Sequence, residues 1–212
     1  MIKLKPGVQR GLGRTTEDAE RLNGPIPYGG YKNALFLSCC ESNAVPLLLQ
    51  RKYWRCNHMV QNPGNLVPPS GTPGAVGAEI ERAYEAGVRD FVVCGHHPCT
   101  VVQALVAPEA SPPSGPSMAA WLAQAAETTR VVAASYAGLD PQARLEAAAQ
   151  VHVLAQLQNL LTYPALAAGV EDGTVALHGW VANTALGQLL HYDPAEGQFM
   201  PWLRTVMKVS SR

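Results

Sequence analysis

The sequence lacks a long apolar run, an excess of charge of either sign and a dense set of cysteines. No apolar run approaches the length of a membrane span, and the opening segment MIKLKPGVQRGLGR has no hydrophobic stretch of the secretory type. These absences argue against a membrane partner and against secretion, so we expect a cytoplasmic protein. Sixteen basic residues balance sixteen acidic ones. A net charge of zero gives no electrostatic basis for a nucleic-acid partner.

Cysteine is sparse and odd in number, which argues against a disulfide framework. The 212 residues include five cysteines, whereas small secreted domains carry dense and even sets. We therefore expect thiols or thiolates at Cys39, Cys40, Cys56, Cys94 and Cys99. With 47% hydrophobic residues, the chain is apolar enough and long enough to bury one full core.

Two short apolar runs in the first half are typical of parallel strands that are covered on both faces. They are residues 34–39 (ALFLSC) and 90–94 (DFVVC), each apolar at consecutive positions. Between them, residues 73–87 (PGAVGAEIERAYEAG) carry apolar side chains at helical spacing, with Pro near the start and Gly87 at the end. The pattern predicts a strand, a helix and a second strand.

The second half predicts two long helices and two closing strands. After a Pro-, Ser- and Gly-rich loop at 107–116, Ser117 can cap an Ala-rich helix that runs toward Ala137. Asp140 and Pro141 suit the start of a second helix, which ends before Pro164. Residues 174–180 and 187–193 are strand-like and can form a hairpin. We expect an α/β fold with a central, mostly parallel sheet flanked by helices.

Cys39, His96 and Cys99 form a candidate set of soft metal ligands. Cys39 ends the first predicted strand, and the His-x-x-Cys pair follows the second. The carboxyl ends of parallel strands converge at one edge of a sheet, so these side chains can meet there. Two thiolates and an imidazole suit zinc and leave a fourth position open. The alternative is that the cysteines are small buried side chains and His96 is a core imidazole, which a bare His-x-x-Cys would favour.

Several strings, in the same order along the chain, resemble the β-carbonic anhydrase family over roughly the last 180 residues. The first is Cys39-Cys40-Glu41-Ser42-Asn43, where the family has Cys-x-Asp-Ser-Arg. The next two are QNPGNLVPP at 61–69 and Gly95-His96-His97-Pro98-Cys99. VLAQLQNLLTYP and LHGW then resemble the late helix and strand of the family. The resemblance implies zinc held by Cys39, His96 and Cys99, and reversible hydration of carbon dioxide to bicarbonate.

The resemblance also implies a catalytic pair, which this chain has altered. Family members use an Asp and an Arg, and the Arg holds the carboxylate off the metal; here Glu41 and Asn43 stand in their places. Asn43 lacks the charge and the forked donors of Arg, so Glu41 loses that restraint. We therefore expect Glu41 to bind zinc as a fourth ligand in at least some conditions. Zinc lowers the pKa of bound water to about 7 only where a coordination position stays open.

Further substitutions describe a remodelled cavity for a small-molecule substrate. Relative to the family, Gln61 replaces an Arg and Thr100 replaces a Gly. The resemblance places the pocket at Gln61, Asn62, Gly95 and His97. Two other functions stay open: an inactive homologue with structural zinc, and a hydrolase of carbonyl sulfide or carbon disulfide.

Family members assemble as homodimers or larger homo-oligomers, often through an amino-terminal arm. By this resemblance, residues 1–33, which are rich in Gly and Pro, form the arm, and residues 34–212 form the zinc domain.

Overall fold

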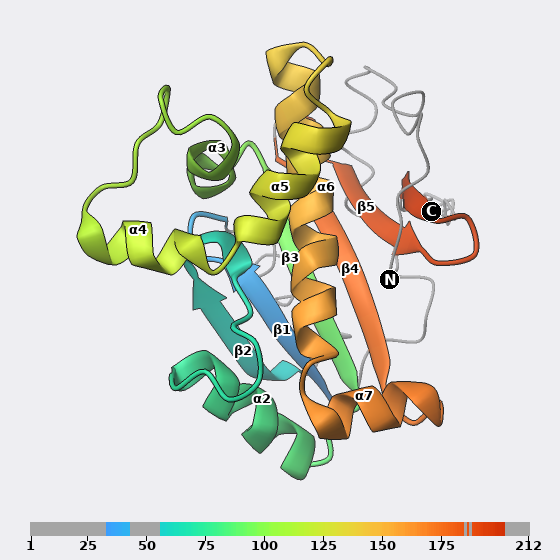
Figure 1. Ribbon diagram of the computed structural model, residues 1–212. Helices are drawn as coiled ribbons and strands as arrows, with labels where there is room; N and C mark the ends of the chain where they lie inside the picture. The colour runs from blue at the N-terminus through green and yellow to red at the C-terminus, as the bar shows by residue number, and fades with distance from the viewer. Residues whose placement is uncertain (1–32, 43–55, 185, 187, 202–212) are drawn as a thin grey trace, which may run out of the picture.

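A six-stranded mixed sheet runs through the part of the chain that the computed structural model describes, which is residues 33–42, 56–184, 186 and 188–201 (Figure 1). The strand order is β2-β1-β3-β4-β5-β6. The strands are β1 (Ala34–Cys39), β2 (Cys56–Asn62), β3 (Asp90–His97), β4 (Ala176–Asn183), β5 (Gln188–Asp193) and β6 (Gln198–Pro201). The predicted arm falls almost entirely at 1–32, and these residues, like Asn43, lie outside the described part.

The first four strands are parallel and the last two are antiparallel, so the predicted mostly parallel sheet is confirmed. β1 pairs with β2 and β3, and β3 pairs with β4, each in parallel. β4 and β5 form the expected hairpin, and β5 continues to β6. Every residue of β1 is buried, as its unbroken apolar sequence predicts.

The structure corrects the predicted strand–helix–strand unit, because β2 lies between β1 and the helix. The sequence of β2, CNHMVQN, has little apolar character, and the reason is its position at the edge of the sheet. An edge strand keeps some side chains in solvent, and Met59 is 46% exposed. A weakly apolar edge strand gives a much fainter sequence signal than a buried one.

Six α-helices and one 3-10 helix surround the described sheet. They are η3 (Pro63–Asn65), α2 (Ala75–Glu85), α3 (Thr100–Val106), α4 (Pro116–Ala123), α5 (Ala126–Ser135), α6 (Pro141–Leu160) and α7 (Pro164–Glu171). Asp140 caps α6 as predicted, accepting a hydrogen bond from the amide of Ala143 at 3.0 Å. The single helix expected from Ser117 toward Ala137 is wrong: it is divided into α4 and α5.

The division between α4 and α5 has a tertiary cause rather than a local breaker. Leu122 and Ala125, on the two sides of the break, are both buried, and Thr128 of α5 is fully buried against His152 of α6. Packing of α5 against α6, and of Leu122 of α4 into the neighbouring apolar cluster, therefore overrides the uniform helix propensity of this Ala-rich stretch.

Helix α6 packs along β3 and β4, and small residues in the strands permit this close approach (Figure 1). A Cβ atom at Gly179 of β4 would lie 3.0 Å from Cδ1 of Leu157. At Gly95 of β3, a Cβ would lie 2.7 Å from Cγ2 of Val153. The predicted packing role of α6 is thus confirmed, and its position also fixes the carboxyl end of β3.

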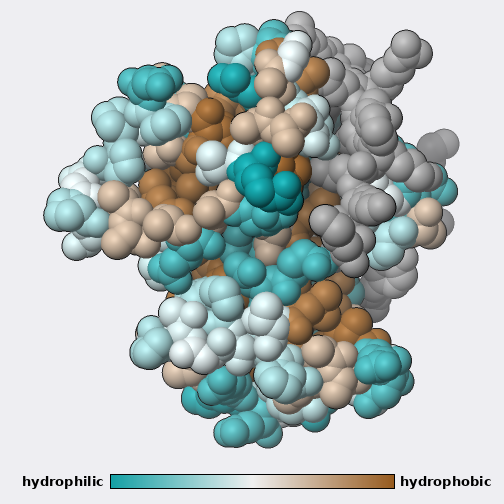
Figure 2. Space-filling view, viewed as in Figure 1, coloured by the Kyte–Doolittle hydropathy of each residue, from teal (hydrophilic) through white to brown (hydrophobic). Residues whose placement is uncertain are grey.

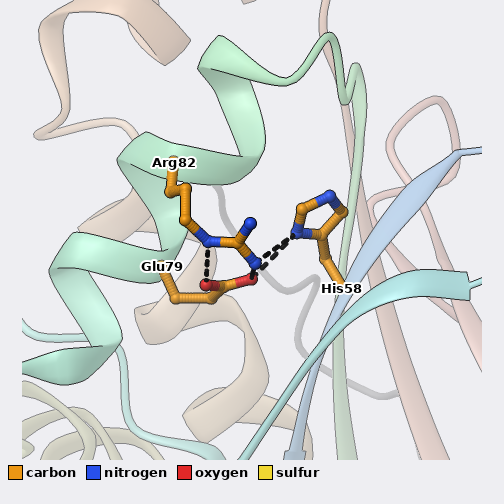
Figure 3. A network of polar contacts seen from close by, with 3 residues as sticks. All are labelled: His58, Glu79 and Arg82. Atoms are coloured by element: carbon orange, nitrogen blue, oxygen red, sulfur yellow. Dashed lines mark hydrogen bonds and ion pairs between the residues drawn. The ribbon is translucent and has the colours of Figure 1, made fainter.

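A polar cluster joins α2 to the edge strand β2 (Figure 3). His58 Nδ1 lies 2.9 Å from Oε1 of Glu79, and Arg82 Nε donates to Oε2 of the same carboxylate at 2.7 Å. The hydrogen bonds from Arg82 lower the pKa of Glu79. This cluster ties the edge of the sheet to its covering helix.

Apolar surface remains between α3 and α4 (Figure 2), where the partly buried Val106, Met118 and Trp121 cover an apolar cluster. Among the described residues, no helix has both the length and the apolar character needed to cross a membrane.

Candidate metal centre

The fold brings the predicted metal ligands together at the carboxyl ends of β1 and β3. Cys39 is the last residue of β1, and Cys99 precedes the first residue of α3. His96 lies within β3, which runs to His97, rather than in a loop after the strand as expected. The sulfurs of Cys39 and Cys99 are 4.0 Å apart. Single ligand atoms of Cys39, Glu41, His96 and Cys99 all lie within 4.8 Å of one another.

This donor set fits a zinc ion in both chemistry and spacing. Two thiolate ligands of a tetrahedral zinc, each bonded at about 2.3 Å, are about 3.8 Å apart, close to the observed separation. The side chains of Cys39, His96 and Cys99 are buried, and both sulfurs belong to an apolar cluster formed with α3, α5 and α6. Nε2 of His96 is buried and has no hydrogen-bond partner among the described residues. A buried imidazole nitrogen in that condition is available to a metal.

The pKa values of the two thiols shift in opposite directions. The pKa of Cys39 is lowered to about 4, chiefly because the Cys99 thiol hydrogen-bonds to it; the nearby imidazole of His96 and the amide of Gly64 act in the same direction against burial. The pKa of Cys99 is raised, because Cys39 is its hydrogen-bond partner and because it is buried. Cys39 therefore ionises first, and a bound divalent cation would favour the thiolate form of both.

Glu41 is held by Thr100, a contact that the sequence analysis missed. One carboxylate oxygen accepts a hydrogen bond from the backbone amide of Thr100 at 3.0 Å, and the other accepts one from its hydroxyl. Thr100 is the first residue of α3, so Glu41 also lies at the positive end of a helix dipole. The sequence contains one sign of the contact between Glu41 and Thr100, namely a hydroxyl residue directly after Cys99. From the sequence, this residue was interpreted only as a change in the cavity.

The four predicted pocket residues occupy different surroundings. A small cavity of about 20 Å³ beside the ligands is lined by His96, His97, Cys99, Val102, Gln103 and Leu145, among others. Of the predicted pocket residues, His97 lines it, and Gln61, Asn62 and Gly95 do not. His97 Nε2 lies 2.8 Å from the side-chain nitrogen of Gln142. Burial lowers the pKa of the His97 imidazole.

The other three residues shape the backbone or face solvent. Asn62 is buried, and its side chain bonds both the amide and the carbonyl of Leu66, at 2.8 and 2.9 Å. Gln61 is exposed on β2. Gly95 allows the approach of α6 described above.

A second group missed by the sequence analysis lies behind Cys39. The amide of Gly64 donates to the Cys39 sulfur at 3.2 Å, and the carbonyl oxygen of Gly64 lies 2.6 Å from Nε2 of His152. His152, for which no partner was identified from the sequence, is fully buried and also contacts Thr128. A glycine-containing turn and a histidine 88 residues apart in the chain carry no local pattern that links them.

Comparison with known proteins shows to which family this chain belongs. The sequence model of the carbonic anhydrase family matches residues 34–189, which include all four ligand candidates. The chain belongs to the β-carbonic anhydrase family. It is 38% identical over 169 residues to the carbonic anhydrase of Pseudomonas aeruginosa, and the match covers 79% of this chain and 76% of that protein. Carbonic anhydrase 1 of Escherichia coli O157:H7 is 36% identical, with the same coverage.

Solved structures of β-carbonic anhydrases share the fold. The β-carbonic anhydrase CcaA is similar with a TM-score of 0.74 at 30% identity, covering 85% of this chain and 82% of that one. A β-carbonic anhydrase from Sordaria macrospora, described as tetrameric, has a TM-score of 0.64 at 21% identity and covers 74% of this chain and 79% of its own. The resemblance recognised in the sequence motifs is confirmed.

Proposed function

We propose that this β-carbonic anhydrase family member binds zinc and catalyses the reversible hydration of carbon dioxide to bicarbonate. The observation that supports the proposal is the convergence of Cys39, Glu41, His96 and Cys99, with their ligand atoms within 4.8 Å of one another at one edge of the sheet. Cys39, His96 and Cys99 would hold the ion. When bound, zinc supplies an ionised water nucleophile near neutral pH.

Glu41 is the residue on which the rate depends in this proposal. Its carboxylate lies within reach of both the metal position and Thr100. We propose that Glu41 takes the fourth coordination position in a closed site and that Thr100 holds the carboxylate when this position is open to water. In the open site the carboxylate orients water through a hydrogen bond and accepts a proton. Thr100 then supplies the restraint that an arginine gives in relatives.

The remaining proposals concern the substrate pocket and the assembly. Carbon dioxide is small and apolar, and the cavity beside His96 and Cys99 has the apolar Val102 and Leu145 in its wall. We assign His97 to this pocket, and we propose that Gln61, Asn62 and Gly95 shape it from neighbouring segments. Asn43 is proposed to act beside Glu41. We also propose a homodimer or larger homo-oligomer, in line with the tetrameric description of the Sordaria macrospora enzymes.

Stopped-flow measurement of carbon dioxide hydration by the zinc-loaded protein tests the function. We expect a rate above that of Cys39→Ser, which lacks a ligand. The double variant Glu41→Asp with Asn43→Arg restores the Asp and Arg of relatives, and we expect it to be faster than the native protein. A native protein with one zinc per chain and no hydration above Cys39→Ser would refute the proposed activity and leave zinc a structural role.

A further inference from the structure

Two helices contact the backbone segment that faces Cys39, and a third helix supports one of these contacts. Trp121 of α4 donates from Nε1 to the carbonyl oxygen of Pro63 at 2.8 Å. His152 of α6 lies with Nε2 2.6 Å from the carbonyl oxygen of Gly64, and its Nδ1 is 2.9 Å from the hydroxyl of Thr128 on α5. Between these two carbonyls, the amide of Gly64 donates to the Cys39 sulfur at 3.2 Å.

The contacts of His152 place a proton on Nε2. The carbonyl of Gly64 can only accept, so Nε2 of His152 must carry the proton and donate. Nδ1 is then the acceptor in the neutral ring, and the Thr128 hydroxyl donates to it. Both side chains are fully buried, with 0% exposure. A single neutral tautomer therefore satisfies every polar atom in this contact.

The Trp121 bond acts on the same peptide unit that faces the sulfur. The carbonyl of Pro63 and the amide of Gly64 belong to one planar peptide, so fixing the oxygen also fixes the direction of the N–H. The Gly64 backbone has a φ of 79°, and a Cβ there would lie 2.6 Å from Cγ1 of Val101. The position thus requires glycine, and the segment takes a turn that a larger residue could hold only with strain.

We propose that His152 and Trp121 are positioning residues for the Cys39 ligand, acting through Gly64. Together they hold the amide of Gly64 toward the sulfur, where the hydrogen bond draws charge from a metal-bound thiolate and limits its movement. Hydrogen bonds of this kind around metal ligands tune both affinity and electronic properties. The inference rests on the metal binding of the proposed function, and it does not depend on hydration activity.

The experiment compares metal release and spectra in four variants. His152→Phe and Trp121→Phe remove the two donors at similar volume, His152→Gln keeps a side-chain N–H donor, and His178→Phe is the control. His178 lies on β4, bonded to Asp90 2.9 Å away, outside the ligand group. Zinc release to a chelator is timed, and the thiolate-to-metal charge-transfer band is recorded with cobalt in place of zinc.

We expect His152→Phe and Trp121→Phe to release zinc about 10- to 100-fold faster, the usual range for loss of a residue supporting a metal ligand, and to shift the cobalt band. His152→Gln should recover part of both properties, and His178→Phe should leave them native even if it lowers stability. The inference is wrong if folded Trp121→Phe and folded His152→Phe both keep the native release rate and band. Trp121 is only partly buried, so Trp121→Phe decides the question if His152→Phe fails to fold.

Metal uptake by the native protein separates this inference from the proposed function. A native protein that takes up neither zinc nor cobalt refutes the proposed function. In that case, hydrogen exchange of the Gly64 amide in the metal-free protein still tests the contacts. We expect faster exchange in Trp121→Phe than in His178→Phe, and equal rates would contradict the inference.

Discussion

Thr100 holds both carboxylate oxygens of Glu41, one through its backbone amide at 3.0 Å and the other through its hydroxyl. The two residues come from different segments of the fold, since Glu41 follows β1 and Thr100 begins α3. A carboxylate that is bonded at both oxygens has fewer orientations open to it. In the proposed function, the balance between this contact and coordination of the metal sets how often a water molecule can enter.

Removal of the Thr100 hydroxyl should close the site. In Thr100→Val, Glu41 keeps the amide bond and loses the hydroxyl bond at nearly constant volume, so the carboxylate turns more readily to the metal. A hydrogen bond to a charged group contributes about 1.5–3 kcal/mol, and we expect hydration to fall about 10-fold or more. Thr100→Ser keeps the hydroxyl and should remain near the native rate. Stopped-flow assays check both, and equal rates for Val and Ser would refute this role of the hydroxyl.

Loss of Cys39, His96 or Cys99 should abolish stoichiometric zinc. Cys39→Ser, His96→Gln and Cys99→Ser each leave two strong ligands, too few for a tight tetrahedral site. Cys94→Ala is the matched control, because Cys94 is a buried thiol on the same strand as His96, and burial raises its pKa to about 12. Elemental analysis after dialysis should give one zinc per chain for the native protein and for Cys94→Ala only. Full zinc in Cys39→Ser would overturn the ligand assignment.

Gly95→Ala should destabilise the protein through a clash with α6. The added Cβ would lie 2.7 Å from Cγ2 of Val153, and forcing an extra carbon into a packed core costs about 1–3 kcal/mol. At Gly138, a Cβ would meet nothing within 4 Å, so Gly138→Ala should leave the free energy of unfolding nearly unchanged. Urea unfolding measures both. Adding Val153→Ala to Gly95→Ala should restore part of the loss if the clash is the cause.

His152 should make the fold less stable in mild acid. Burial lowers the pKa of its imidazole below the ordinary value of 6.5. The unfolded chain therefore takes up this proton at a higher pH than the folded chain, so the free energy of unfolding falls as the pH drops below about 6.5. His152→Phe removes this contribution and should show a shallower fall. Urea unfolding of the metal-free proteins between about pH 5 and pH 8 checks the difference; identical slopes would contradict it.

Much of the sheet could be predicted because its central strands are apolar at consecutive positions. Residues 34–39 are a strand with these bounds, and the strand predicted at 90–94 runs on to His97. β2 carried a weaker pattern because it is an edge strand, and the break between α4 and α5 accompanies the burial of Leu122, Ala125 and Thr128 in the fold. Such features follow from tertiary packing, which a local pattern does not contain.

The ligand set was predictable for a different reason. Thiols and an imidazole at the ends of neighbouring parallel strands are typical of a site for a soft metal ion such as zinc. The contacts of Glu41 with Thr100 and of His152 with Gly64 were not predictable in this way. Thr100 and His152 are ordinary residues of helices, and their roles arise only once α3 and α6 are placed against the ends of β1 and β3.

The separation of 60 positions between Cys39 and Cys99 decides when the proposed metal site can form during synthesis. A ribosome must translate beyond Cys99 and release that segment from its exit tunnel before both sulfurs can reach one ion. His152 lies another 53 positions after Cys99. Growing chains emerge at about 5–20 residues per second, so Cys39 spends seconds outside the ribosome with neither its partner sulfur nor the turn behind it in place. If the protein binds zinc as proposed, metal capture is therefore a late event in the synthesis of this chain.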